Sequence, residues 1–230
     1  MEIRILDDER AVAAAAADLI AAAAREAVQL RGRFLCAVSG GRTPWTMLAE
    51  LAGRSVPWTA VQVFQVDERV APAGDPDRNL THLRATLLAQ APLGPGQIHA
   101  MPVEAPDLQL AARQYAGELA ASAGTPPVLD LVHLGLGGDG HTASLVPGSP
   151  VLEETSADVG LAGPYQGHCR MTLTFPVIDR ARRVLWVVTG AEKAAMLRRL
   201  RDADRSIPAG RVRQDRAVLL ADRAAAGAAI

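Results

Sequence analysis

The chain has 230 residues, a formal net charge of −1 at pH 7 and an apolar fraction of 49%. This length and composition are ordinary for one large α/β domain with a sizeable core, so we expect a single domain over residues 1–230. The near-zero charge and the scattered basic residues lack the basic footprint of nucleic-acid binders, and we predict no nucleic-acid partner.

The first predicted element is a helix that contains the Ala-rich run 11–24 and has an apolar stripe from Val12 to Leu30. Asp7, Asp8 and Glu9 precede this stretch, and Asp18 interrupts it. A secretory leader begins with basic residues, and a membrane-spanning helix needs about 20 apolar residues without such a charge. We therefore predict an amphipathic helix capped by Asp7 or Asp8 and no membrane partner.

Strand-like apolar runs alternate with helical stretches along the rest of the chain. The predicted strands comprise residues 34–38, 61–66, 130–136, 170–174, 184–189 and 218–221. The predicted helices comprise residues 44–51, 79–90, 107–121 and 191–201 and the C-terminal tail. This alternation is typical of βαβ units and indicates an α/β fold with a mostly parallel sheet flanked by helices.

A Gly-rich loop joins the first of these strands to the next helix. It consists of Ser39, Gly40, Gly41, Arg42 and Thr43, and Pro44 follows at the expected first position of the helix. Free N–H groups at a helix start, with hydroxyl groups beside them, can hold a phosphate without a metal. An ordinary helix start with Thr43 as its N-cap is the alternative, and the loop alone leaves both open.

Ser39 also lies in a sequence that resembles a loosened G-x-S-x-G nucleophile elbow. An esterase of this kind would use Ser39 as its nucleophile, but Ala37 stands where the first glycine belongs. The loop has neither the G-x-G-x-x-G dinucleotide fingerprint nor the Gly-Lys-Ser/Thr ending of a Walker loop. We therefore predict no nucleotide cofactor.

Three consecutive charged residues, Asp67, Glu68 and Arg69, follow the predicted strand 61–66. Residues just beyond the carboxyl ends of parallel strands line the ligand crevice, so these side chains are expected on the ligand face. A short charged run after a strand is nevertheless typical of a solvated loop. On its own, this segment is only a weak indication of a site.

The most informative segment follows the apolar run 129–136. Four of the six residues 135–140 are glycine, and Asp139 and His141 stand in the same turn. Glycines allow the backbone to turn sharply and to approach a ligand closely. A carboxylate and an imidazole in such a turn suit general-base catalysis, nucleophilic catalysis or metal binding.

Metal binding is the least favoured of these three. His133 lies within a predicted strand and is expected to be a core histidine. Cys36 and Cys169 are far apart in the sequence and form no C-x-x-C pair, so no known ligand spacing emerges. We predict no metal ligand and expect both cysteines to be buried free thiols of a cytoplasmic protein.

Lys193 is the only lysine among the 24 basic residues. It follows the predicted strand 184–189 at the start of a helix, where an ammonium group is a suitable phosphate ligand. A solvated lysine retained by chance is the alternative. We favour the phosphate ligand, because lysine and arginine interchange poorly at anion sites.

Together these segments resemble the 6-phosphogluconolactonases, a family that shares its fold with the glucosamine-6-phosphate deaminases. The resemblance rests on residues 39–44, 67–70, 79, 135–147, 170–174, 189–193 and 208–210, which stand in the family's order. It implies a single Rossmann-like domain of the sugar-phosphate isomerase/deaminase type. It also implies that His141 is the catalytic residue and that Asp139 supports it.

The resemblance further implies a site for a phosphorylated sugar lactone. The substrate-binding residues that it suggests are Ser39, Gly40, Gly41, Arg42, Thr43, Asp67, Arg69, Arg170 and Lys193. The deaminase branch has a catalytic carboxylate five residues beyond the histidine of the motif, where this chain has Val146 before Pro147. Val146 therefore counts against deamination or isomerisation of the sugar.

These observations predict a hydrolase that opens 6-phospho-D-glucono-1,5-lactone in the oxidative pentose phosphate pathway. His141 is expected to activate water as a general base, because an imidazole has an ordinary pKa of about 6.5 and is largely unprotonated at neutral pH. Hydrolysis of an activated ester requires no metal and no organic cofactor. The alternatives are a sugar-phosphate deaminase or isomerase and a non-catalytic sugar-phosphate sensor. We expect a cytoplasmic monomer or small homo-oligomer.

Overall fold

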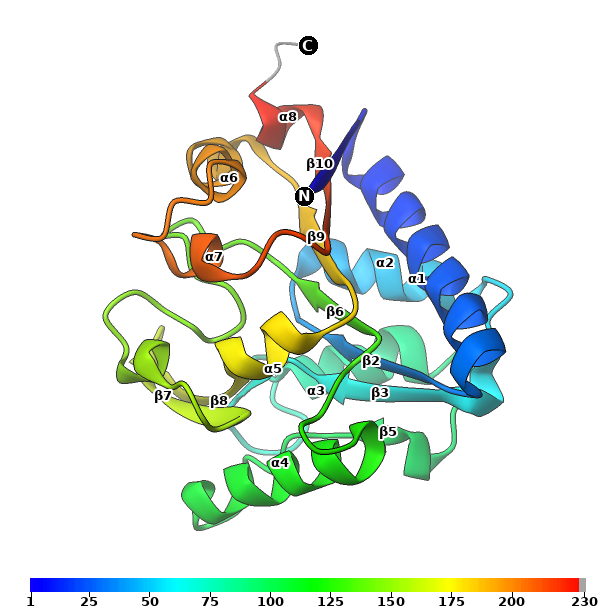
Figure 1. Cartoon of the computed structure of the whole chain (residues 1–230), viewed down its shortest axis with the longest axis vertical. Coiled ribbons are helices and arrows are strands. Elements are labelled where there is room, and N and C mark those ends of the chain that lie inside the picture. The colour runs from blue at the N-terminus through cyan, green and yellow to red at the C-terminus, as the bar shows by residue number, and fades with distance from the viewer. Residues whose placement is uncertain (228–230) are drawn as a thin grey trace.

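The computed structural model describes residues 1–227 and contains two sheets (Figure 1). All strands of the seven-stranded sheet are parallel. In spatial order they are β1 (Glu2–Leu6), β10 (Ala217–Asp222), β9 (Val184–Val188), β6 (Leu131–Leu134), β2 (Phe34–Val38), β3 (Val61–Gln65) and β5 (Ile98–His99). The smaller sheet is antiparallel and consists of β4 (Asp67–Arg69), β8 (His168–Leu173) and β7 (Val159–Tyr165).

Helices connect most of the strands and cover the large sheet. They are α1 (Glu9–Arg31), α2 (Arg42–Ala52), α3 (Asn79–Leu83), α4 (Leu108–Ala123), α5 (Phe175–Arg180), α6 (Ala194–Arg201), α7 (Pro208–Arg211) and α8 (Arg223–Ala226). A π-helical turn, Arg84–Leu88, continues α3. The expected α/β fold with a mostly parallel sheet is therefore confirmed.

Alternate residues of each central strand face opposite sides of the large sheet, so the sheet separates two apolar clusters. On β2, Phe34 and Cys36 belong to a cluster with α1, α2 and α3, whereas Leu35 belongs to a cluster with α4, α5 and the small sheet. Burial on both faces explains why the central strands are continuous apolar runs in the sequence. This pattern made them predictable.

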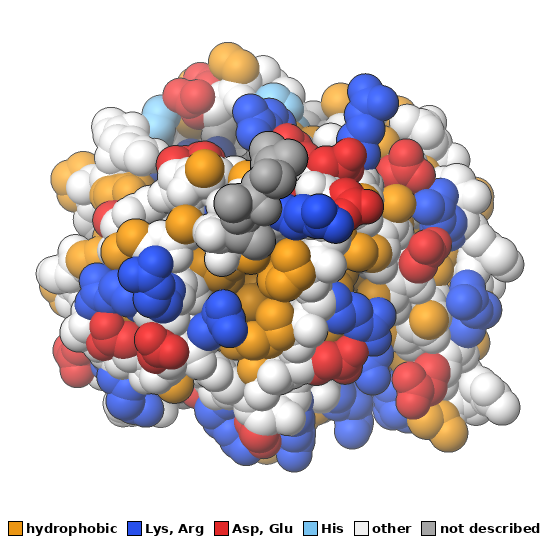
Figure 2. Space-filling model, turned by 90° about the horizontal axis from the view of Figure 1, so that it is seen from above, with side chains coloured by type: hydrophobic (Ala, Val, Ile, Leu, Met, Phe, Trp, Pro, Cys, Tyr) orange, Lys and Arg blue, Asp and Glu red, His pale blue; other side chains and the backbone are white. Residues whose placement is uncertain are grey.

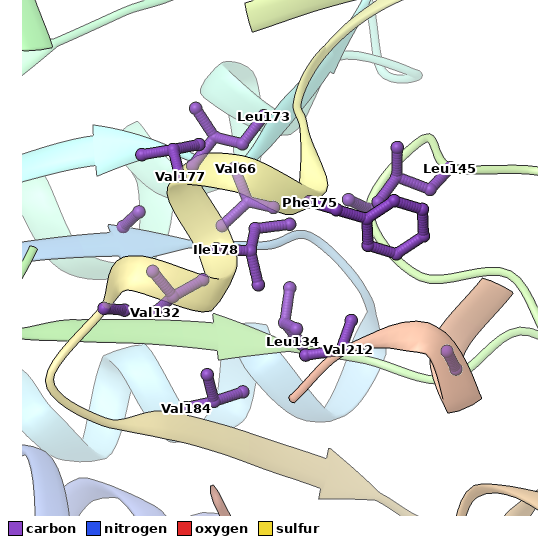
Figure 3. Close-up of a cluster of buried hydrophobic side chains, with 14 of the residues drawn as sticks. Val66, Val132, Leu134, Leu145, Leu173, Phe175, Val177, Ile178, Val184 and Val212 are labelled. Atoms are coloured by element: carbon purple, nitrogen blue, oxygen red, sulfur yellow. The ribbon is translucent and has the colours of Figure 1, made fainter. Parts of the chain in front are cut away.

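Helix α5 illustrates the packing of the second cluster (Figure 3). Its Ile178 points toward Leu134 of β6, and its Val177 lies beside Val66 and Leu173. All five side chains are fully buried. Burying an aliphatic side chain of this size stabilises the folded chain by roughly 1.5–3 kcal/mol. The cluster thereby fixes the end of β6, from which the Gly-rich turn emerges.

The strand order locates the functional crevice. From β2 the chain moves outward through β3 to β5, and it then returns to place β6 on the other side of β2. Ligands of open parallel sheets bind beyond the carboxyl ends of the strands at such a reversal of strand order. The two Gly-rich loops follow β2 and β6, so both begin at this reversal.

Helix α1 begins where the sequence predicted. The Asp8 side chain accepts a hydrogen bond of 2.8 Å from the N–H of Ala11, and Gly32 ends the helix in the left-handed conformation at φ 74°. None of the helices within residues 1–227 is both long enough and apolar enough to cross a bilayer. On the face seen in Figure 2, acidic and basic side chains are interspersed, in keeping with the net charge.

Several expectations from the sequence were wrong or incomplete. Strand β1 was not expected, because it is an exposed edge strand that has no continuous apolar run. Strand β7 was missed because it contains two glycines and Pro164, which are depleted in strands. Cys36 is buried as expected, but Cys169 is exposed, because the first two residues of β8 extend beyond the core. The predicted C-terminal helix is present as α8, and the last three residues lie outside the described part of the chain.

Candidate active site

A cavity of about 560 Å³ opens beyond the carboxyl ends of β2, β6 and β9. The loop after β2, the Gly-rich turn after β6, the small sheet and the 3₁₀ turn Ala191–Lys193 all contribute to its lining. The lining includes every predicted catalytic or substrate-binding residue: Ser39, Gly40, Gly41, Arg42, Thr43, Asp67, Arg69, Asp139, His141, Arg170 and Lys193. Residues far apart in the sequence thus share one cavity.

The loop after β2 needs glycine for two different reasons. A Cβ atom on Gly40 would lie 2.0 Å from Oδ1 of Asn79, so only glycine fits there. Gly41 has φ 135°, a conformation that residues with a side chain rarely adopt. Helix α2 begins at Arg42 with Gly41 as its N-cap, two residues earlier than the expected start at Pro44.

Thr43 is not the N-cap that the sequence offered as one interpretation. Its hydroxyl lies 3.0 Å from Oε1 of Glu9 and 2.6 Å from the hydroxyl of Thr189. The hydroxyl therefore ties α2 to α1 and to the end of β9. This contact fixes the loop in position beside the residues that follow β9.

The turn after β6 is shaped around the His141 ring. A Cβ atom on Gly137 would lie 2.0 Å from Nδ1 of His141, so the absence of a side chain makes room for the imidazole. Gly140 has φ 86°, and a Cβ atom there would also meet Ile207 at 2.7 Å. The N–H of Gly137 donates to the carbonyl oxygen of His141 at 2.8 Å and closes the turn.

Asp139 holds the imidazole through one carboxylate oxygen. Oδ1 of Asp139 accepts hydrogen bonds from Nδ1 of His141 at 2.5 Å and from the His141 N–H at 3.1 Å. Burial raises the pKa of Asp139, but these hydrogen bonds outweigh burial and leave the pKa below its ordinary value. With Nδ1 as the donor, Nε2 of the neutral ring is the nitrogen that can accept a proton.

The interpretation of residues 67–69 as a solvated loop is wrong, because they form β4 and the Glu68 side chain is fully buried. The Glu68 carboxylate accepts backbone hydrogen bonds from Arg69, Asn79 and Leu80 at 2.7–2.8 Å. These bonds offset the cost of burying its polar oxygens. Glu68 therefore fastens β4 to the start of α3.

Asp67 and Asn79 hold the neighbouring arginine. Oδ2 of Asp67 accepts a hydrogen bond of 2.7 Å from the Ser144 hydroxyl, while the Asn79 amide donates to the Asp67 carbonyl at 2.9 Å. Burial raises the pKa of Asp67, although Ser144, Arg69 and Arg170 favour the charged form. Oδ1 of Asn79 accepts a bond of 2.9 Å from the Arg69 guanidinium.

Four basic residues line the cavity, and one of them, Arg42, is paired with Glu9, which leaves the three cations Arg69, Arg170 and Lys193. Arg69 of β4 and Arg170 of β8 are directly opposed across the small sheet, and burial followed by the repulsion of Arg69 lowers the pKa of Arg170. The Lys193 side chain has no hydrogen bond or ion pair with any other residue in the described range 1–227, and the backbone N–H of Lys193 donates to the Gly190 carbonyl oxygen. An anion bound beside Arg69 and Arg170 would offset the repulsion between these two like charges.

The sequence did not predict two other residues of the lining, Tyr165 and Gln166. The Tyr165 hydroxyl donates a hydrogen bond of 3.0 Å to Oδ2 of Asp139, the oxygen that His141 does not contact. The only local signal was the Gln166-Gly167 pair, which forms the turn between β7 and β8. That signal was lost because β7 itself was not expected.

His133 is the expected core histidine and lies below the Ser39 loop. It is fully buried, and Nδ1 accepts a hydrogen bond of 3.3 Å from the N–H of Ser39. Nε2 has no partner among the described residues. Burial lowers the pKa of His133 to about 3, so the ring is neutral at physiological pH.

This burial predicts a loss of stability in mild acid. The folded chain binds a proton at His133 only near pH 3, whereas the unfolded chain binds it near pH 6.5. The stabilisation is fully present above pH 6.5 and decreases as the pH falls. The free energy of unfolding should therefore lose about 2 kcal/mol through this residue between pH 7 and pH 5.

Urea denaturation at a series of pH values would measure this loss. His133→Asn is the matched variant, because it keeps an acceptor for the Ser39 N–H but does not titrate. Between pH 7 and pH 5, the free energy of unfolding of the variant is expected to fall by about 2 kcal/mol less than that of the wild type, whatever the absolute stability of the variant. An equal pH dependence in both proteins would contradict the assignment.

Within residues 1–227, no group of three or more His, Cys, Asp or Glu side chains is arranged to hold a metal ion. In particular, Asp139 and His141 are joined by a hydrogen bond to each other. Tyr165 also donates to Asp139. Both oxygens of the Asp139 carboxylate thus accept hydrogen bonds from protein groups.

Comparison with known proteins agrees with this geometry. A 6-phosphogluconolactonase of Synechocystis sp. is 40% identical over 172 residues, which cover 73% of this chain and 71% of that protein. The 6-phosphogluconolactonase of Mycobacterium tuberculosis is 37% identical over 238 aligned positions, covering 97% and 96% of the two chains. The solved structure of 6-phosphogluconolactonase from Trypanosoma brucei superposes with a TM-score of 0.87 at 27% identity and covers 98% of this chain and 97% of that one.

The family model described as glucosamine-6-phosphate isomerases/6-phosphogluconolactonase matches residues 7–220. This match contains both sheets except for β1 and the last residues of β10. It also contains every residue of the cavity. The chain therefore belongs to the glucosamine-6-phosphate isomerase/6-phosphogluconolactonase family.

Proposed function

We propose that this chain is a 6-phosphogluconolactonase that hydrolyses 6-phospho-D-glucono-1,5-lactone to 6-phosphogluconate. The observation that carries the proposal is the Asp139–His141 pair, which lies on the same cavity as Arg69, Arg170 and Lys193. A base and a group of cations suit a neutral ester that carries a remote phosphate. The lactonases to which the chain is similar support the same substrate.

In the proposed reaction, Nε2 of His141 accepts a proton from water as the water oxygen attacks the lactone carbonyl carbon. The imidazolium that forms is stabilised by the Asp139 carboxylate. When the tetrahedral intermediate collapses, the bond from that carbon to the ring oxygen breaks, and the imidazolium returns the proton to the ring oxygen. The products are a carboxylic acid, which ionises, and a free hydroxyl group.

The Gly-rich turn offers donors for the negative charge of the intermediate. The N–H groups of Gly138 and Asp139 have no acceptor within residues 1–227. We propose that one or both donate to the developing oxyanion. Such preorganised donors typically contribute about 10²- to 10³-fold to the rate.

The phosphate is proposed to bind between the loop 39–43 and the three cations. Arg69 and Arg170 form one wall, and Lys193 contributes a further positive charge. This remote binding energy positions the lactone carbonyl near His141. Arg42 and Asp67 also line the cavity, but each already has a partner, Glu9 for Arg42 and Ser144 for Asp67.

The domain organisation, the oligomeric state and the metabolic pathway of the chain are also part of the proposal. We propose that residues 1–230 act as one lactonase domain, as a cytoplasmic monomer or small homo-oligomer of the oxidative pentose phosphate pathway. The substrate implies the step that follows oxidation of a sugar phosphate to its lactone. The parallel sheet and its two apolar clusters support the single domain.

The substrate test compares two reactions on the purified chain. The chain is expected to accelerate opening of 6-phospho-D-glucono-1,5-lactone above the spontaneous rate and to release no ammonia from glucosamine 6-phosphate. Val146, which is buried and has no carboxylate, supports the second expectation. Ammonia release would indicate a deaminase, whereas a thermal shift with 6-phosphogluconate but no turnover of the lactone would indicate a sensor.

A further inference from the structure

The hairpin of β7 and β8 holds Tyr165 in one place at the cavity. Tyr165 is the last residue of β7 and pairs with His168 of β8 across the two-residue turn Gln166-Gly167. Both turn residues have positive φ, 51° and 85°. A tight turn of this kind matches the twist of the two strands and leaves little freedom at its ends.

The Tyr165 backbone and ring are also fixed by Arg170. The Tyr165 carbonyl oxygen accepts hydrogen bonds from Nε and Nη2 of Arg170 at 3.4 and 3.2 Å. The Arg170 guanidinium lies 5.1 Å from the centre of the Tyr165 ring, within the range of a cation–π contact. Tyr165 thereby links Arg170 of β8 to Asp139 of the Gly-rich turn after β6.

The hydroxyl of Tyr165 completes the hydrogen bonding of Asp139. It donates to Oδ2 at 3.0 Å and lies 3.3 Å from Nδ1 of His141, while Oδ1 accepts from that Nδ1 at 2.5 Å. The Tyr165 and His141 rings also meet edge to face, with their centres 5.2 Å apart. Burial and the hydrogen bond to Asp139 raise the pKa of Tyr165, so the hydroxyl remains a donor.

Within residues 1–227, His141 and Tyr165 are the residues that donate hydrogen bonds to the Asp139 carboxylate, and only Tyr165 donates to Oδ2. The Asp139 side chain is 38% exposed, and Asp139 stands between Gly138 and Gly140. Water competes for an exposed carboxylate, and rotation of the group would turn Oδ1 away from His141. A donor on the opposite oxygen opposes this rotation.

We propose that Tyr165 is a positioning residue, whose hydroxyl holds the Asp139 carboxylate in the orientation that aligns His141 for proton transfer. The proposal rests on the proposed function of His141 as the general base. It assigns Tyr165 no contact with the reacting atoms. The residue acts on the rate of the chemical step and not on the binding of the phosphorylated substrate.

Tyr165→Phe tests this role, because it keeps the ring and removes only the hydroxyl. We expect kcat to fall about 10-fold, as for the loss of one hydrogen bond to a charged group, while KM changes less than about twofold. In the Asp139→Asn background, Tyr165→Phe is expected to cause less than about a twofold further loss, because the carboxylate is absent and only the longer contact with His141 remains. A structural defect would instead act independently of Asp139.

Tyr115→Phe is the matched control, since Tyr115 is the other tyrosine of the chain. Tyr115 lies on α4, and its hydroxyl is hydrogen-bonded to the backbone of Gln65 and not to a residue of the cavity turn 135–141. The Tyr115→Phe variant is expected to lower the melting temperature without changing kcat. An increase in KM at unchanged kcat in Tyr165→Phe, or an equal loss in both Asp139 backgrounds, would overturn the role of Tyr165.

Failure of the two proposals can be told apart. A wild-type chain that does not open the lactone contradicts the proposed function and, with it, this role. An active wild type whose activity depends on His141 but not on the Tyr165 hydroxyl contradicts only the positioning role.

Discussion

Replacing His141 by alanine is expected to lower kcat/KM for 6-phospho-D-glucono-1,5-lactone by about 10²- to 10⁴-fold, the usual contribution of a positioned general base. The imidazole lines the cavity and can accept a proton, because its Nδ1 is occupied by Asp139 and its Nε2 has no partner within residues 1–227. Rates are to be measured above the spontaneous opening of the lactone. KM should change little, since the cations of the cavity remain.

His82→Ala is the control for removal of a histidine. His82 lies on α3, stacks on Trp45 and does not line the cavity. The His82→Ala variant should therefore retain wild-type kcat/KM. A His141→Ala variant that opened the lactone as fast as the wild type would refute the general base while leaving the family assignment intact.

Replacing Lys193 by methionine is expected to lower kcat/KM for the phosphorylated lactone by about 10- to 100-fold. A hydrogen bond between charged groups contributes about 1.5–3 kcal/mol, and each 1.4 kcal/mol corresponds to a factor of ten. Because the side chain of Lys193 has no partner within residues 1–227, its removal leaves no other side chain without a partner. The loss is therefore expected in substrate binding and not in stability.

Two comparisons isolate the phosphate in this experiment. The slow opening of unphosphorylated glucono-1,5-lactone should be the same in Lys193→Met and wild type. Arg201→Met makes the same change in net charge at an exposed position on α6 outside the cavity, and it should leave both reactions unchanged. Equal losses for both lactones in Lys193→Met would contradict phosphate binding by this residue.

The strands that were predicted correctly are those buried on both faces. Strands β2 and β9 have five consecutive buried residues each, so each is a continuous apolar run in the sequence. Strands β1 and β7 were missed because neither has such a run: β1 is an exposed edge, and β7 carries glycine and proline. The partner of β1 is β10, at the other end of the chain, whereas β7 pairs with the next strand, β8, across the turn Gln166-Gly167.

The site could be predicted in part for a similar reason. Gly40 and Gly137 mark places where a Cβ atom would collide with Asn79 or His141, and this local requirement is visible as glycine in the sequence. The burial of Glu68 was not visible, because a charged side chain inside the protein depends on backbone donors from another segment. Tyr165 was not visible either, since its partner Asp139 lies 26 residues away.

By itself, the sequence determined the α/β class through its apolar periodicity and the Gly-rich turns through the local backbone geometry that glycine allows. Its motifs, by their resemblance to a known family, indicated the candidate site residues. Only the tertiary structure decided which of those residues meet. The placement of β6 beside β2 brings the Asp139–His141 turn next to the Ser39 loop, and the small sheet brings Arg69 and Arg170 together. Such contacts depend on strand order, which the pattern of residues along a single chain does not specify.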